Sequence, residues 1–157
     1  MSGIIPCLWF DTDGEEAANF YTSLFPNSTI LNVSRYGEGG PRAAGTVMTV
    51  SFELDGLEFL ALNGGPNYTF SEAVSFMVSC ADQEEVDRYW EALSEGGEEG
   101  PCGWLKDRFG LSWQIVPKAL PRLLGDPDPA KAQRVMQAMM GMRKIVIDEL
   151  EQAALPA

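Results

Sequence analysis

The chain has 157 residues, of which 45% are hydrophobic and 22% are charged, a composition typical of a globular protein and unlike that of a disordered one. Its formal net charge of -12 disfavours binding to nucleic acid or to an anionic membrane. The sequence contains no histidine, which excludes Ser-His and Cys-His nucleophiles and imidazole-ligated metal sites. No apolar run approaches the roughly 20 residues that span a bilayer. No secretory signal is visible, so we expect a cytoplasmic protein with three reduced cysteines.

One residue pattern occurs twice along the chain. An Asp, two Glu, a small apolar residue, two adjacent aromatic residues and a Leu begin at Asp13 and again at Asp82. Each copy follows a short apolar run. A repeat of this length predicts two copies of one supersecondary unit.

The first copy predicts a unit of the order β-α-β-β-β. Pro6 lies inside the first apolar run and favours an edge position for that strand. Asp13 stands where a helix would be capped, and the apolar residues after it have helical spacing. Asp55-Gly56 is a strong signal for a two-residue hairpin. The expected elements are a strand at 4–10, a helix at 15–25 and strands at 29–36, 45–54 and 57–62.

The second copy predicts a shorter unit followed by a helical tail. We expect a strand at 73–80, a helix at 84–94, a shortened hairpin and a strong last strand ending near residue 117. Asp128-Pro129 has the residue types of a helix start. The apolar face of this tail helix would comprise Val135, Met139, Met142, Val146 and Leu150. Whether it covers the chain's own sheet or a second subunit is open.

Four segments resemble the PhnB-like branch of the vicinal oxygen chelate superfamily, the glyoxalase and bleomycin-resistance fold. They are residues 15–21 (EEAANFY), 24–26 (LFP), 62–66 (LNGGP) and 107–116 (DRFGLSWQIV). Members of this branch often carry the name 3-demethylubiquinone-9 3-methyltransferase. The resemblance implies an α+β fold, in which tandem βαβββ units form a curved mixed-sheet cup with outer helices, plus a C-terminal helix. We expect one domain at 1–126, with units at about 4–66 and 73–117, and a helical extension at 127–157.

The resemblance also implies where metal-binding relatives place their ligands, one on each of four strands. The corresponding positions hold Pro6, Asn63, Ser75 and Gln114, with a slip of one residue open for Asn63. Proline has no donor side chain and the others are neutral, whereas divalent ions recruit carboxylates, imidazoles or thiolates. We therefore expect neither a metal nor another cofactor.

Strand alternation predicts the lining of the cup. It turns Cys7 and Trp9 toward the outer helix of the first unit, and Cys80 and Trp113 toward that of the second. Tyr36 and Trp104, beside glycine-rich loops, are candidates for the rim. The candidate ligand pocket comprises Pro6, Leu8, Phe10, Tyr36, Asn63, Ser75, Met77, Trp104, Ser112 and Gln114.

From these residues we expect a protein that binds a small organic molecule, forms a homodimer, and binds neither nucleic acid nor membrane. No catalytic residue can be assigned. The alternatives are a metal-dependent lyase, isomerase or dioxygenase, a structural or interaction module, and the methyltransferase for which relatives are named. The last would need a strand, a glycine-rich turn and a helix to hold its cofactor. Cys102 is expected to be the most exposed thiol.

Overall fold

The computed structural model describes residues 3–156 and divides into two compact units, residues 1–70 and 71–157. The division falls in the stretch expected to link the two repeats. Each unit is described by itself. Within the described residues, no helix has the length and apolar character needed to cross a membrane.

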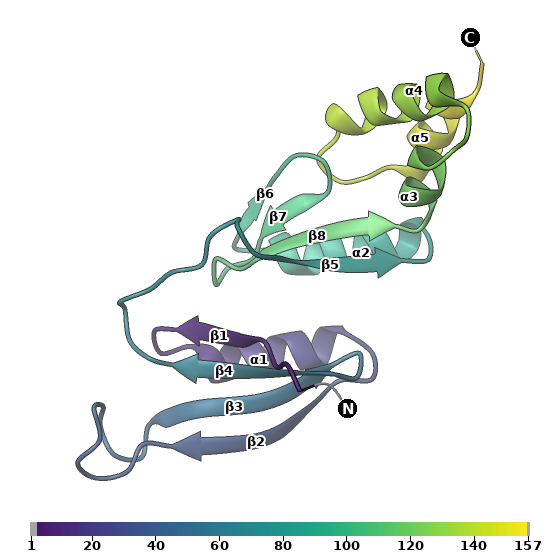
Figure 1. Ribbon diagram of the computed structural model, residues 1–157. Helices are drawn as coiled ribbons and strands as arrows, with labels where there is room; N and C mark the ends of the chain where they lie inside the picture. The colour runs from purple at the N-terminus through teal and green to yellow at the C-terminus, as the bar shows by residue number, and fades with distance from the viewer. Residues whose placement is uncertain (1–2, 157) are drawn as a thin grey trace. The chain divides into compact units, whose positions relative to one another are not determined.

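The first unit is a four-stranded sheet with one helix (Figure 1). Strand β1 pairs in parallel with β4, and β4, β3 and β2 follow as antiparallel neighbours. The order β1-β4-β3-β2 makes β1 an edge strand, as Pro6 predicted. The elements are β1 (Cys7–Phe10), α1 (Gly14–Leu24), β2 (Thr29–Arg35), β3 (Val47–Leu54) and β4 (Leu57–Asn63).

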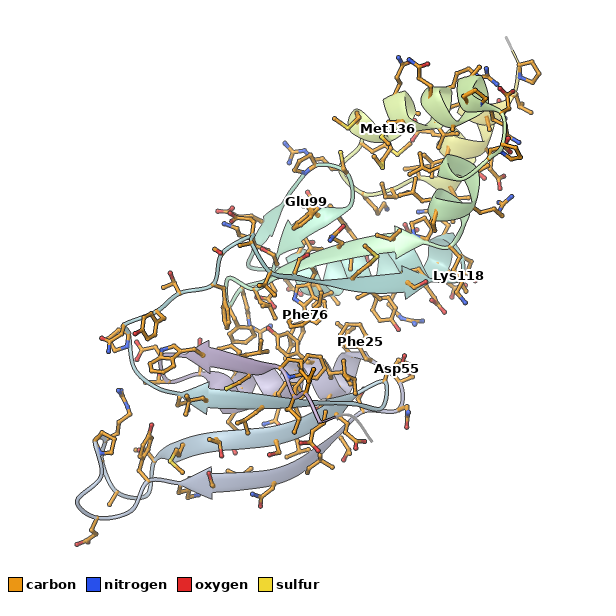
Figure 2. The ribbon with its side chains drawn as sticks, in the orientation of Figure 1. Phe25, Asp55, Phe76, Glu99, Lys118 and Met136 are labelled. Atoms are coloured by element: carbon orange, nitrogen blue, oxygen red, sulfur yellow. The ribbon has the colours of Figure 1, made fainter. Side chains whose placement is uncertain are left out.

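The hairpin between β3 and β4 has the predicted two-residue turn. Leu54 pairs with Leu57, and Asp55 and Gly56 both have positive φ angles, of 49° and 80°. Two positive φ angles belong to the type I′ turn, whose twist matches that of the flanking strands. Figure 2 shows Asp55 at this turn.

The start of α1 differs from the prediction. Asp13 is the N-cap residue, but its side chain makes no capping hydrogen bond. The amide oxygen of Asn63, at the end of β4, instead accepts the Gly14 N–H at 2.8 Å. An unpaired N–H at a helix start needs an acceptor, and a residue 49 positions away supplies it.

The second unit repeats the βαβββ order with a reduced hairpin. Its sheet order is β5-β8-β7-β6, with β5 parallel to β8 and α2 along one face (Figure 1). Asp82, which holds the place of Asp13 in the second copy of the repeat, caps α2 and accepts the Glu85 N–H at 2.9 Å. The elements are β5 (Ser75–Cys80), α2 (Gln83–Ser94), β6 (Glu98–Glu99), β7 (Trp104–Lys106) and β8 (Ser112–Pro117).

The turn between β7 and β8 is built around a buried carboxylate. Asp107 is 2% exposed. Its Oδ1 accepts the N–H groups of Phe109 and Leu111 at 2.9 and 3.0 Å, and its Oδ2 accepts the Trp113 indole N–H at 2.9 Å. This one side chain therefore closes the turn and fixes the orientation of Trp113 near the start of β8.

The tail contains three helices where one was predicted. They are α3 (Ala119–Leu124), α4 (Pro129–Met140) and α5 (Ile147–Ala154). Gly141 ends α4, so the predicted continuous apolar face is folded back on itself. Val135 and Leu150 of that face join a core with Leu120, Leu123, Ile145 and Ala154, and Met139 and Met142 pack against it.

The tail docks on its own unit, which answers the question left open by the sequence. The Gln83 side chain donates to the Ile145 carbonyl at 3.0 Å and accepts the Ile147 N–H at 2.7 Å. Val116 on β8 packs against the tail core. The start of α2 and the end of β8 thus hold the tail in place.

Candidate functional site

The face of the second sheet opposite α2 carries most of the predicted polar site residues. Register places Ser75 beside Ser112, and Met77 beside Gln114. The Gln114 amide donates to the Ser75 hydroxyl at 3.0 Å. Met77 is 61% exposed. Here the predicted alternation agrees with the structure, since Trp113 and Cys80 are buried on the helix side.

A cavity of about 410 Å³ opens on this face, within the usual range for small-molecule sites. Trp104 and Lys106 reach it from β7, in register with Gln114 and Ser112 of β8. Figure 2 shows Glu99 at the end of the sheet where β6 and β7 lie. The side chains that give the cavity its chemistry are Glu72, Glu98, Trp104, Lys106 and Ser112.

One ion pair stands in the cavity wall. Lys106 Nζ contacts the carboxylate of Glu72. This hydrogen bond lowers the pKa of Glu72 and raises the pKa of Lys106. Both groups therefore stay charged at neutral pH, and Lys106 is already matched by one carboxylate.

The Ser112 hydroxyl is the unusual group in this wall. Ser112 is 0% exposed, and its Oγ has no hydrogen-bond partner among the described residues. Buried hydroxyls are paired in the large majority of cases, so an unpaired one at a cavity asks for an explanation.

Two predicted residues of the first unit lie on the other side of their sheet. Leu8 and Phe10 are buried, and a Cβ on Gly14 of α1 would lie 3.4 Å from the Phe10 ring. They therefore face α1, whereas Cys7 is exposed. The prediction that Leu8 and Phe10 face away from the helix is wrong.

Asn63 and Tyr36 are held inside the first unit. Besides accepting from Gly14, the Asn63 amide donates to the carbonyls of Thr12 and Val47, each at 3.2 Å. The Tyr36 hydroxyl donates to the Asn63 carbonyl at 2.6 Å, and Tyr36 is only 9% exposed. These contacts give both residues structural roles, and they place Tyr36 in the interior rather than at a rim.

The four positions where metal-binding relatives hold ligands do not fit a divalent cation. Pro6 precedes β1 and offers only its carbonyl, which accepts the Leu60 N–H at 2.9 Å. The Asn63 oxygen is committed to α1, and Ser75 and Gln114 bond to each other. Across residues 3–156, no three Cys, Asp or Glu side chains gather where they could hold a metal ion. Neutral oxygens cannot offset the desolvation of a divalent ion.

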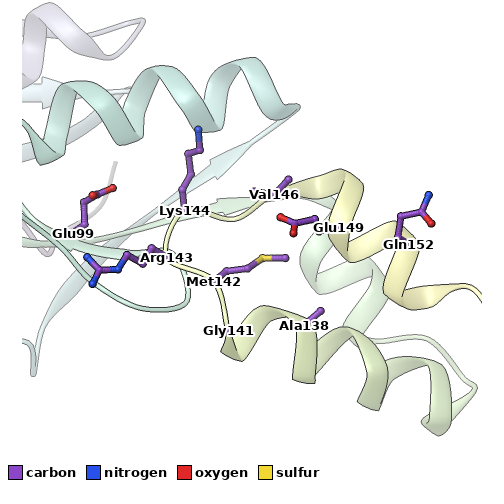
Figure 3. Close-up of a pocket in the computed structure, with 9 residues that line it drawn as sticks. All are labelled: Glu99, Ala138, Gly141, Met142, Arg143, Lys144, Val146, Glu149 and Gln152. Carbon is purple, nitrogen blue, oxygen red and sulfur yellow. The ribbon is translucent and has the colours of Figure 1, made fainter.

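A second, larger cleft of about 670 Å³ lies in the tail (Figure 3). Glu149 and Gln152 reach it from α5, and Arg143 and Lys144 from the segment before α5. Lys144 pairs with Asp87 at 2.8 Å. Sequence reasoning missed this cleft because it depends on the helix break at Gly141. Its charges are mixed and it holds none of the predicted site residues.

The three thiols differ in exposure. Cys7 is exposed, Cys102 is half-buried and Cys80 is buried, so the expectation that Cys102 is the most exposed is wrong. Burial raises the pKa of the Cys80 thiol from its ordinary value of 9.0 to about 12.

We expect Cys80 to resist thiol reagents in the native protein at neutral pH. The loss of thiolate alone slows its reaction by about a thousandfold. A variant with Cys7→Ser and Cys102→Ser isolates this thiol, and reaction with a chromogenic disulfide measures it before and after unfolding. Rapid modification of the native double variant would show that Cys80 is accessible.

Comparison with known proteins places the chain in a family. A sequence model described as 3-demethylubiquinone-9 3-methyltransferase matches residues 2–116. The chain belongs to this family. A PhnB protein from Bacillus cereus is 38% identical, with a TM-score of 0.67, over 74% of this chain and 99% of that one. No curated protein matches the chain.

More distant structures share the fold of this PhnB-like chain. Protein PA1353 from Pseudomonas aeruginosa is 21% identical, with a TM-score of 0.62, over 74% of this chain and 98% of its own. The fosfomycin resistance protein FosX of Listeria monocytogenes, solved with Mn(II) and sulfate, is 19% identical. Its TM-score is 0.53, over 73% of this chain and 91% of its own. These neighbours agree with the vicinal oxygen chelate fold expected from the sequence.

Proposed function

We propose that this PhnB-like protein binds a small organic molecule without a metal, in the cavity on the open face of the second sheet. The observation that carries the proposal is the cavity of about 410 Å³ walled by the Trp104 side chain. An aromatic wall with a few polar groups is the usual make-up of a small-molecule site. The Ser75–Gln114 pair lies in register beside Trp104 and adds polar groups to the same face.

We do not carry over the transferase activity in the family's name. A nucleotide-like cofactor is usually held by a glycine-rich turn that opens a helix. Gly64-Gly65 follows β4, but the next element is the strand β5. The manganese in the FosX structure is likewise a property of that protein, and the residues at the corresponding positions of this chain are neutral. We also propose that the protein forms a homodimer and is cytoplasmic. Light scattering of the purified chain measures its oligomeric state.

Thermal-shift screening of the full chain against a broad library of small organic molecules tests the proposal, because a ligand of the native state raises the unfolding temperature. We expect Trp104→Ala to weaken binding of the hits by at least about tenfold, since it removes roughly 1.5–3 kcal/mol of apolar contact. Trp104→Phe keeps an aromatic wall and should retain most of the affinity.

Tyr68→Ala is the matched control, because Tyr68 is a 66% exposed aromatic residue of the first unit. It should leave binding unchanged. A library without any hit, or hits that bind Trp104→Ala as well as the parent, would refute the proposal.

A further inference from the structure

We infer that the cavity beside Trp104 selects small organic cations that also carry a hydrogen-bonding group. This inference rests on the proposed function, because it concerns the same cavity. It names the chemistry of the ligand: an ammonium or guanidinium group with a polar group attached.

The first step is the charge of the walls. Glu72 and Glu98 contribute two carboxylates and Lys106 contributes one ammonium, which leaves a formal charge of -1. The Glu99 carboxylate is turned toward α2, where it accepts the Trp90 indole N–H at 2.6 Å. Lys106 is matched by Glu72, so it has no charge left for an anionic ligand. A negative cavity in a protein of net charge -12 attracts cations and repels anions.

The second step is the aromatic wall. The indole of tryptophan is the best aromatic partner for a cation, through the negative potential of its face. Trp104 is half-buried and lines the cavity together with the acidic residues. The Glu98 carboxylate, in register with Lys106 on the same face, would then lie beside a positive group held against the ring.

The third step is independent of charge. The Ser112 hydroxyl lines the same cavity, is buried, and lacks a hydrogen-bond partner among residues 3–156. A hydroxyl both donates and accepts, so a ligand hydroxyl, amine or carbonyl satisfies it. This requirement excludes a purely apolar cation as the best ligand.

Matched ligand pairs test the inference on the full chain, by calorimetry and thermal shift. The panel consists of primary amines and quaternary ammonium compounds, each with its neutral isostere in which carbon replaces the charged nitrogen. Choline and its carbon isostere form the first pair, and tetramethylammonium is the cation without a hydroxyl. We expect the cations to bind at least about tenfold more tightly than their isosteres, and more weakly in high salt.

Substitutions assign the effect to named groups. Glu98→Gln should remove most of the preference for cations, because it removes the carboxylate beside Trp104 and leaves the Lys106–Glu72 pair in place. Glu95→Gln, an exposed residue that does not line the cavity, is the control. Ser112→Ala should weaken the binding of choline and leave the binding of tetramethylammonium unchanged.

The outcomes separate the two proposals. Neutral isosteres that bind as well as their cations would overturn the charge preference and leave the binding function in place. Cation binding that persists unchanged in the Glu98→Gln variant would overturn the assignment to Glu98. An absence of binding by every member of the panel and of the broad library would overturn both.

Discussion

Replacement of Asp107 by alanine is expected to destabilise the protein by about 3–5 kcal/mol, because it leaves two buried donors and one partly buried donor without their acceptor. These donors are the N–H groups of Phe109 and Leu111 and the indole of Trp113. Asp107→Asn keeps one oxygen and should cost less, since it mainly loses the bond to Trp113. Urea unfolding followed by circular dichroism measures both variants.

The control for Asp107 is Glu91→Ala, an exposed acidic residue on α2. It should change the free energy of unfolding by no more than about 0.5 kcal/mol. An Asp107→Ala variant as stable as this control would mean that the turn is held together by other contacts.

Replacement of Asn63 by alanine is expected to destabilise the first unit by about 2–4 kcal/mol. The change removes the acceptor for Gly14 at the start of α1 and the donor for the Thr12 and Val47 carbonyls. The bond to the Gly14 N–H is buried and Asn63 is only 6% exposed, so the loss of this acceptor is expected to be the most costly part of the change. Thermal and urea unfolding measure the effect.

Asn32→Ala, at an exposed position of β2, is the matched control and should be nearly neutral. The same pair of variants distinguishes a structural role of Asn63 from a role in ligand binding. If Asn63→Ala keeps its stability and loses ligand binding, Asn63 belongs to the site, as the sequence had indicated.

Short-range signals in the sequence predicted the local structure well. The Asp55-Gly56 turn and the Asp82 cap depend on a few consecutive residues, and both are found. The cap of α1 could not be predicted in this way. The acceptor is Asn63, which lies 49 positions after Gly14 in the sequence. The residues around the helix start point to Asp13 as the cap, and nothing in them indicates Asn63.

Side-chain direction was predictable only where the strand register was secure. In the second unit, Gln114 and Ser75 lie on the open face as alternation predicts. In the first unit, the inward face of β1 was assigned from the ligand position of relatives, and an assignment that is off by one residue turns every side chain to the other face. That difference of one residue puts Leu8 and Phe10 under α1.

The charged part of the cavity was also missed. Glu98 belongs to a two-residue strand, which is too short to produce a periodic pattern in the sequence. The relevance of Glu72 depends on its ion pair with Lys106, a partner 34 positions later in the sequence (106 minus 72). Only the fold brings these charges together.

The bonds of Gln83 to the tail bear on the order in which the chain can fold during synthesis. They join the start of α2 to residues 62 and 64 positions later. Contacts of this separation form late, because the loop between them must close first. The first unit can be completed while the ribosome is still translating, but the second unit must wait for its last helix. A chain that stops before α5 would leave the tail core without Leu150 and Ala154, and a growing chain passes through the same unfinished state before its release.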